Sequence, residues 1–156
     1  MTRVLILGGG GMVGQKLARL LLKEGLPEGS TPQITLHDLG FPPGGAAVDD
    51  QRVGDLSNAA EGAALAAERF DVIYHLASIV SGEAEQNFDK GWQTNLWPMW
   101  HFLEALRAQH RATGGTYRPK VIFTSSIAAL IRRKSQMIFY RRPRPPMARK
   151  RRPASF

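Results

Sequence analysis

The chain has 156 residues, 43% of them hydrophobic, which allows one domain with a buried core. It contains no cysteine, so disulfides and thiolate metal sites are excluded, and no apolar run is long enough for a signal peptide or a membrane span. The formal net charge of +8 is unevenly spread, because residues 1–131 hold all 13 acidic residues and 11 of the 21 Lys and Arg, whereas residues 132–156 hold ten Lys and Arg and no acid.

The chain begins with a strand, a run of glycines and a helix. Residues 3–7 form a short apolar run, which is typical of a strand covered on both faces. Apolar residues then recur at helical spacing over residues 12–23. A second strand is predicted over residues 33–37, and the loop GFPPGG at residues 40–45 separates it from a short strand at residues 51–53.

The alternation continues in the second half of the chain. An Ala-rich helix with Ser57 as its N-cap is predicted to run to residue 69. Strands are predicted over residues 71–76 and 120–124. Between them, residues 86–111 are predicted as helix, with an irregularity at their Trp-Pro pair.

Strands and helices that alternate with connections of this length indicate the α/β fold class. The arrangement they favour is a Rossmann-like, doubly wound parallel sheet covered by helices. An α/β domain of another topology is the alternative.

The sharpest motif is GGGGMVG at residues 8–14, where Gly8, Gly11 and Gly14 keep a G-x-x-G-x-x-G spacing between a strand and a helix. Gly8 lets the chain turn sharply, Gly11 lets the backbone approach a pyrophosphate, and Gly14 lets the helix pack close to the strand. The helix N-terminus adds unpaired N–H groups and the positive end of its dipole. The motif predicts a dinucleotide site. A methyltransferase nucleoside site is an alternative, and a Walker loop is excluded because no Gly-Lys-Ser/Thr occurs.

Asp38 stands at the end of the second predicted strand. A carboxylate there can accept hydrogen bonds from the adenosine ribose hydroxyls, and its charge repels a 2′-phosphate. The glycine loop has no Arg to receive such a phosphate. We therefore expect NAD rather than NADP as the cofactor. The alternative is that Asp38 is only a carboxylate at the entry to a loop.

Five segments occur in a fixed order along residues 1 to about 128. They are GGGGMVG, GDLSN at residues 54–58, VIYHLAS at residues 72–78, Asn95, and VIFTSS at residues 121–126. Together they resemble the extended short-chain dehydrogenase/reductase family, of the NAD-dependent epimerase/dehydratase type. The stretch HLASIVSGEAEQNFDKGWQTN is most similar to the D-erythronate dehydrogenase branch, which oxidises a four-carbon sugar acid.

The resemblance implies a role for several residues by their position. Ser126 matches the family's catalytic Ser/Thr, which hydrogen-bonds the substrate oxygen. Asp55 and Leu56 would flank the adenine, and residues 76–78 would line the path to the nicotinamide ribose. The expected cofactor-binding residues are Gly8, Gly11, Met12, Val13, Gly14, Asp38, Asp55, Leu56, Leu76, Ala77, Ser78 and Asn95.

The residue types alone also allow plainer interpretations. Asp55 is then a turn carboxylate, His75 a packed strand-end residue rather than a base, and Ser126 the cap of a turn. The three tryptophans within residues 92–100 either pack or present hydrophobic surface that a partner or a further domain would bury.

The family's chemistry also uses a tyrosine as acid and base, with a lysine four positions later. The lysine lowers the tyrosine pKa and holds the nicotinamide ribose. Downstream of Ser126 the one tyrosine is Tyr140, and Arg144 stands four positions later. Pro143 would break the helix that carries the pair in the family. We therefore reject Tyr140 and Arg144 as a working pair and expect the chain as given to be inactive.

Two regions follow from these features. Residues 1–128 are interpreted as the N-terminal portion of an NAD-binding Rossmann domain, whose sheet is incomplete. Residues 129–156 are interpreted as a disordered, basic Pro/Arg-rich tail that arises from a frameshift, because a shifted reading frame permits Ser-Tyr-Gly-x-x-Lys there. The alternative is a genuine basic tail that is solvated or binds nucleic acid.

The expected function is NAD-dependent oxidation of a hydroxyl of a four-carbon sugar acid such as D-erythronate, with this chain as a truncated, inactive form. Alternatives are a noncatalytic NAD-binding module, a nucleotide-sugar epimerase/dehydratase fragment, and a basic-tailed nucleic-acid binder. We expect a small-molecule substrate (a sugar acid or a nucleotide sugar), a homodimer in the intact relative, and a cytoplasmic location. We expect no metal, no membrane contact and no specific nucleic-acid partner.

Overall fold

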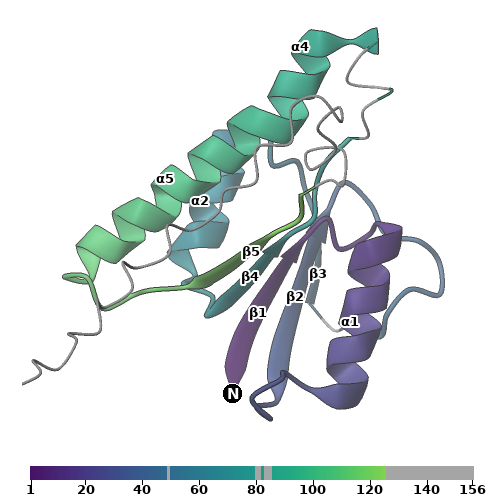
Figure 1. Ribbon diagram of the computed structural model, residues 1–156, viewed down its shortest axis with the longest axis vertical. Helices are drawn as coiled ribbons and strands as arrows, with labels where there is room; N and C mark the ends of the chain where they lie inside the picture. The colour runs from purple at the N-terminus through teal and green to yellow at the C-terminus, as the bar shows by residue number, and fades with distance from the viewer. Residues whose placement is uncertain (49, 80–81, 83–85, 126–156) are drawn as a thin grey trace, which may run out of the picture. The chain divides into compact units, whose positions relative to one another are not determined.

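The computed structural model describes residues 1–48, 50–79, 82 and 86–125. Its compact unit, Met1–Thr124, contains a five-stranded parallel sheet with the strand order β3-β2-β1-β4-β5 (Figure 1). Ser126 and the predicted tail at residues 129–156 lie outside the described residues.

The strands agree with the predicted ones to within one residue at each end. They are β1 (Thr2–Leu7), β2 (Pro32–Asp38), β3 (Asp50–Val53), β4 (Val72–His75) and β5 (Lys120–Phe123). The three inner strands are mostly buried, whereas the residues of β3 and β5 at the two edges are half-buried or exposed. Composition does not explain this difference, since the edge strand β5 (KVIF) is at least as apolar as the inner strand β2 (PQITLHD). It follows from the place of each strand in the sheet.

β1 lies at the centre of the sheet, where Val4 pairs with Ile34 of β2 on one side and with Val72 of β4 on the other. Alternate side chains of β1 point to opposite faces, and each face has its own core. One core packs against α1 (Met12–Glu24), and the other against α2 (Ala59–Ala67) and α5 (Trp97–Ala112) (Figure 1). The first includes Val4, Ile6, Ala18, Leu21, Ile34 and Leu36, and the second Leu5, Leu7, Leu65, Ile73, Phe102 and Leu106. The doubly wound parallel sheet is therefore confirmed.

α2 begins one residue later than predicted, so the assignment of Ser57 as its N-cap is wrong. The N-cap is Asn58, whose Oδ1 accepts a hydrogen bond from the Ala60 N–H at 3.1 Å. Ser57 belongs to the preceding turn, where its N–H donates to Oδ1 of Asp55 at 2.8 Å. The helix also ends earlier, since Arg69 has a left-handed backbone with φ 58°.

The predicted helix over residues 86–111 is interrupted before its Trp-Pro pair. α4 (Phe88–Gly91) leads into a π-helical turn, η1 (Trp92–Leu96), and α5 follows. Pro98 lies in the first turn of α5, where a backbone N–H has no acceptor within the helix, so the proline does not break it. The irregularity therefore precedes the proline instead of lying at it.

The three tryptophans of this region lie outside the two cores. Trp92, Trp97 and Trp100 are 41%, 48% and 56% exposed. The Trp92 ring lies 5.6 Å from that of Phe88 and 6.0 Å from that of Trp97. The Trp92 and Trp97 rings thus pack against each other, and all three tryptophans leave hydrophobic surface exposed.

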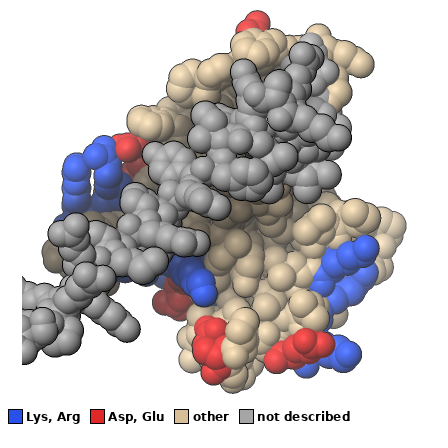
Figure 2. Space-filling model, viewed as in Figure 1, with Lys and Arg blue, Asp and Glu red and all other residues tan. Residues whose placement is uncertain are grey.

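On the face seen in Figure 2, the Lys and Arg of the described residues lie among Asp and Glu, in keeping with the near balance of charge in residues 1–131. Within the described part of the chain, no helix combines the length and the apolar character that crossing a bilayer requires. The described His, Asp and Glu side chains likewise form no group of three that could hold a metal ion.

Candidate functional site

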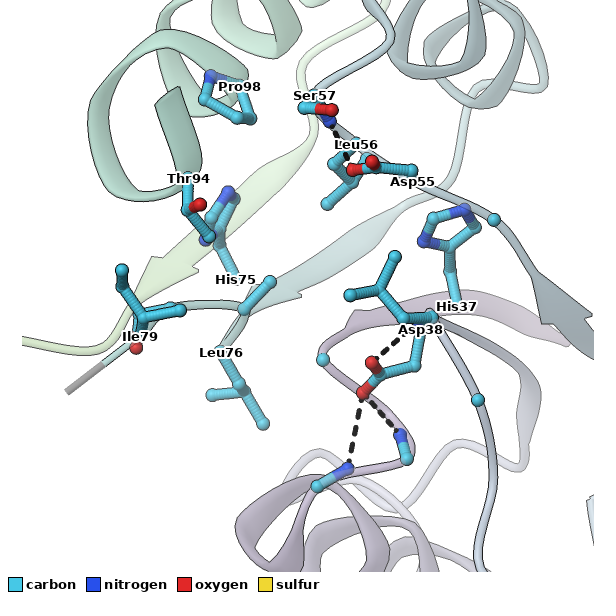
Figure 3. Close-up of a pocket in the computed structure, with 18 residues that line it drawn as sticks. His37, Asp38, Asp55, Leu56, Ser57, His75, Leu76, Ile79, Thr94 and Pro98 are labelled. Atoms are coloured by element: carbon cyan, nitrogen blue, oxygen red, sulfur yellow. Dashed lines mark hydrogen bonds between the residues drawn. The ribbon is translucent and has the colours of Figure 1, made fainter. Parts of the chain in front are cut away.

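A cavity of about 420 Å³ lies at the carboxyl ends of the strands (Figure 3). The segments that follow β1, β2, β3 and β4 form its walls, and η1 and α5 add one residue each. The strand order reverses at β1: β2 and β3 follow on one side of it, and β4 and β5 on the other. Open α/β sheets bind their ligands at such a point.

The three motif glycines meet different surroundings at the cavity. Gly8 has a φ of +84°, and a Cβ there would lie 2.6 Å from the backbone nitrogen of Ala77, so both the turn and the close approach require glycine. A Cβ at Gly14 would lie 2.3 Å from the carbonyl oxygen of Gly8, because α1 packs directly on the loop. A Cβ at Gly11 would meet only the same oxygen, at 3.5 Å. The fold itself therefore leaves room for a side chain at Gly11.

The N-terminus of α1 borders the cavity through its N-cap, Gly11. Gly11 is the N-cap and has no side chain to cap the helix, and the Gln15 N–H donates to the Gly11 carbonyl at 2.9 Å. The N–H groups before Gln15 belong to the turn that has no intrahelical acceptor. Met12 and Val13 have exposed side chains and do not line the cavity, so only their backbone can contribute to the site. Such a helix end suits an anion.

Asp38 joins the end of β2 to the glycine loop. Its Oδ2 accepts hydrogen bonds from the N–H groups of Gly10 at 2.8 Å and Gly11 at 3.2 Å, and its Oδ1 accepts one from Leu39 at 2.7 Å. A carboxylate has about four acceptor positions, so roughly one remains for a hydroxyl group in the cavity. Figure 3 shows the Asp38 side chain pointing to the glycine loop.

Asp55 and Leu56 form the opposite wall, after β3. The Asp55 carboxylate accepts a hydrogen bond from the Ser57 N–H at 2.8 Å, and this bond is the main reason that the pKa of Asp55 lies below its ordinary value. The geometry thus shows Asp55 as a turn carboxylate that also lines the cavity. Leu56 is half-buried against the second core.

His75 lies at the end of β4 and is only 4% exposed. Neither of its ring nitrogens has a hydrogen-bond partner among the described residues, and its ring packs 5.9 Å from that of Phe123. Burial lowers its pKa, which favours the neutral imidazole. This environment agrees with the plainer interpretation of His75 as a packed strand-end residue.

Asn95 fixes the loop that leaves β4 without lining the main cavity. Its Oδ1 accepts a hydrogen bond from the Ile79 N–H at 2.8 Å, and its Nδ2 donates to the Ile79 carbonyl at 3.1 Å. Its neighbour Thr94 lines the cavity instead, and Asn95 borders a smaller hollow beside Trp92. Adjacent residues on a helix point in different directions, so Thr94 and Asn95 border different hollows.

The structure brings together most, but not all, of the expected site residues. Those that line the cavity are Gly8, Gly11, Asp38, Asp55, Leu56, Leu76, Ala77 and Ser78. Met12, Val13, Gly14 and Asn95 lie next to it, and Ser126 lies outside the described residues. The lining residues that sequence reasoning missed are Gly10, His37, Leu39, Gly40, Gly54, Ser57, His75, Ile79, Thr94 and Pro98. Adjacency to strand ends could have indicated most of them, but Thr94 and Pro98 come from helical segments.

The sequence model of the NAD dependent epimerase/dehydratase family matches residues 4–139. The D-erythronate dehydrogenase of Cupriavidus necator is 40% identical over 134 residues, which are 80% of this chain. That of Haemophilus influenzae is 36% identical over 145 residues, which are 81% of this chain. The chain spans only 39% and 38% of the lengths of these two relatives.

Solved structures show the same fold. The nucleoside-diphosphate-sugar epimerase of Agrobacterium tumefaciens superposes with a TM-score of 0.72 and is 42% identical, covering 81% of this chain and 38% of its own. The uronate dehydrogenase of the same species has a TM-score of 0.60 and 26% identity, covering 81% and 41%, and a mutant of it was solved in complex with NAD.

Proposed function

This chain belongs to the NAD-dependent epimerase/dehydratase family, and from that premise we propose that its cavity binds NAD as the cofactor of a dehydrogenase. The observation that carries the proposal is the space at Gly11. The fold leaves a Cβ there unobstructed, yet the position is glycine and lies at the uncapped N-terminus of α1. A backbone that must approach a pyrophosphate accounts for both facts.

The donors and acceptors around the cavity suit the two halves of NAD. The N–H groups of the first turn of α1 would hold the pyrophosphate, and Asp38 would accept a hydrogen bond from the adenosine ribose. Asp55 and Leu56 would flank the adenine, and residues 76–78 would line the path to the nicotinamide ribose. We prefer NAD to NADP because the Asp38 charge repels a 2′-phosphate.

The proposed substrate is a four-carbon sugar acid such as D-erythronate. The support is the identity of 40% and 36% to two D-erythronate dehydrogenases, together with the resemblance of residues 75–95 to that branch. A second candidate is a nucleotide sugar, because a nucleoside-diphosphate-sugar epimerase is 42% identical over the matched part.

The proposed chemistry needs a group that this chain does not supply. Bound NAD would supply the hydride acceptor. Ser126 would hydrogen-bond the substrate hydroxyl, and a tyrosine beside a lysine would remove its proton. The chain has no Tyr-x-x-x-Lys after Ser126, so we propose that the 156-residue protein binds NAD without turning it over.

Calorimetric titration of the purified chain with NAD and with NADP tests the cofactor. We expect NAD to bind, and NADP to bind at least about tenfold more weakly, which corresponds to about 1.4 kcal/mol. Binding of neither nucleotide would overturn the proposal. The absence of turnover is tested separately by adding D-erythronate and NAD to the purified chain. Steady formation of NADH would show that the predicted inactivity is wrong.

The two substrate candidates can be distinguished by assaying a full-length homologue that carries the tyrosine and the lysine. A dehydrogenase for a sugar acid forms NADH in proportion to substrate consumed. An epimerase interconverts nucleotide sugars and leaves no net NADH. The products therefore decide between them.

A further inference from the structure

The Glu61 carboxylate connects α2 by hydrogen bonds to β2 and to the segment after β3, beside the cavity. Glu61, in the first turn of α2, places Oε1 2.7 Å from Nε2 of His37 at the end of β2. Its Oε2 accepts a hydrogen bond from the N–H of Asp55, in the segment after β3, at 2.9 Å. The His37 side chain is 2% exposed and that of Glu61 28% exposed. Both carboxylate oxygens are thus engaged close to the cavity wall.

The backbone of that wall lies directly against the pair. A Cβ added to Gly54 would lie 1.5 Å from Oε1 of Glu61 and 2.7 Å from Nε2 of His37. The Gly54 N–H also donates to the Asp38 carbonyl at 2.9 Å. The segment from Gly54 to Ser57 is therefore held on one side by β2 and on the other by the Glu61 carboxylate. Figure 3 shows the His37 ring beside this segment.

The position of Glu61 would suit an ordinary helix cap, but its carboxylate bonds elsewhere. Glu61 is the third residue after the N-cap Asn58, where a glutamate commonly accepts a hydrogen bond from the N-cap N–H. Here the Asn58 N–H donates to the Asp55 carbonyl at 3.0 Å instead. The Glu61 side chain reaches past the cap to the Asp55 N–H and to His37. An ionised carboxylate only accepts hydrogen bonds, so Nε2 of His37 carries the proton between them.

We propose that Glu61 and His37 are positioning residues, which hold Gly54 to Ser57 in the conformation that receives the adenosine half of a nucleotide. This inference rests on the proposed function, since it takes NAD as the occupant of the cavity. All four residues of the segment line the cavity, whereas Glu61 does not. Glu61 therefore acts on the ligand through the backbone of Asp55.

The test compares the wild-type chain with Glu61→Ala, Glu61→Gln and Glu68→Ala, using NAD and AMP as probes. Glu68 is a matched control, because it follows the same helix, is similarly exposed at 33%, and pairs with Arg3 and Arg52 away from the cavity. We expect Glu61→Ala to weaken both ligands by about tenfold. Glu61→Gln should stay within about threefold, because its amide can both accept from Asp55 and donate to His37. Glu68→Ala should lower the melting temperature without changing either affinity.

Hydrogen exchange of the Asp55 amide, followed by NMR, reports directly on its hydrogen bond to Glu61. It should be faster in Glu61→Ala than in the wild type and unchanged in Glu68→Ala. Wild-type affinity for AMP in Glu61→Ala would overturn the inference, as would an equal loss in Glu68→Ala or a loss in Glu61→Gln as large as in Glu61→Ala. Unchanged Asp55 exchange in Glu61→Ala also overturns it and leaves the proposed function standing. A wild-type chain that binds neither NAD nor AMP overturns the proposed function itself.

Discussion

Gly11 and Gly14 are about one helical turn apart, and an alanine at each should affect a different property. Gly11→Ala should change the free energy of unfolding by less than about 1 kcal/mol, because its Cβ has room and alanine is only a poorer N-cap. It should weaken NAD binding by about tenfold or more, because the methyl group would stand where the pyrophosphate approaches. Thermal unfolding and calorimetry of the same sample measure both quantities.

Gly14→Ala is the control for that experiment. Its Cβ would lie 2.3 Å from the Gly8 carbonyl oxygen, so α1 must shift away from the loop. We expect a loss of about 1–3 kcal/mol in the free energy of unfolding, as in other overpacked sites. If Gly11→Ala destabilised the protein as much as Gly14→Ala and left NAD binding intact, the pyrophosphate role of Gly11 would be wrong.

His75 should make the stability of the protein fall in mildly acidic solution. Its pKa in the folded state is lowered from 6.5 by burial, so the unfolded chain takes up a proton first as the pH falls. The stabilising contribution is complete above pH 6.5 and is lost as the pH falls below it. The slope contributed by one such group is at most about 1.4 kcal/mol per pH unit.

Urea unfolding between neutral and mildly acidic pH checks this prediction. His75→Leu should flatten the dependence of the unfolding free energy on pH, because the buried imidazole is gone. His101→Gln, at an exposed position on α5, should leave the dependence as it is in the wild type. An unaltered slope in His75→Leu would assign the acid sensitivity to another group.

Some of the site residues that sequence reasoning found, such as Asp55 and Leu56, were implied by the family resemblance, and others follow an apolar run recognisable as a strand. Asp38 and Gly8 are examples, since each comes at the end of a buried strand. Thr94 could not be found in this way, because a π-helical turn and the packing of α5 bring it to the cavity. The link between Glu61 and Asp55 likewise depends on a side-chain conformation that residue spacing does not fix.

At the scale of elements, charged side chains connect the ends of β1, β3 and α2 away from the cavity. Arg52 of β3 forms an ion pair with Asp50 at 2.8 Å and another with Glu68, and Arg3 of β1 pairs with Glu68 at 3.1 Å. The guanidinium of Arg3 also lies over the ring of Phe70, 4.6 Å from its centroid. The hydrogen bond from Arg52 is the largest reason that the pKa of Asp50 is lowered.

Removal of Arg52 should loosen this connection. Arg52→Met should lower the free energy of unfolding by about 0.5–1 kcal/mol, because the pairs are partly exposed but share charges in a network. The loss should shrink when salt is added. Arg107→Met, which removes a single exposed pair with Glu104, is the comparison and should cost less. Equal losses in the two variants would show that the network adds nothing beyond its separate pairs.

The strands and helices could largely be predicted because their periodicity reflects burial on two faces of one sheet. α1 and all five strands have the expected bounds to within one residue. The start of α2 could not be resolved, since Ser57 and Asn58 are both good caps and tertiary hydrogen bonds choose between them. An irregularity was predicted at Trp97-Pro98, but its position in η1, just before that pair, and its π-helical form could not be read from residue spacing.

At the scale of the whole molecule, the chain spans 39% of the length of a D-erythronate dehydrogenase. Residues 132–156 hold ten of its 21 Lys and Arg and no acid. We propose that the sequence from about residue 129 onward arises from a frameshift. Genomic sequencing across codons 125–156 should show a shifted frame that reads Ser-Tyr-Gly-x-x-Lys and stays open beyond it. A shifted frame that soon stops, without that motif, would make the basic tail genuine. The family match extends to residue 139, which is beyond the proposed boundary. The DNA sequence would therefore also show at which codon the frame changes.

The central place of β1 has a consequence for how the chain is made. Val4 leaves the ribosome first, but its partners Ile34 and Val72 follow much later in the sequence. At about 5–20 residues per second, β4 emerges a few seconds after β2. During that interval β1, α1 and β2 can fold together while the other edge of β1 remains open. A nascent chain arrested after β2 should therefore be the species that chaperones hold most readily.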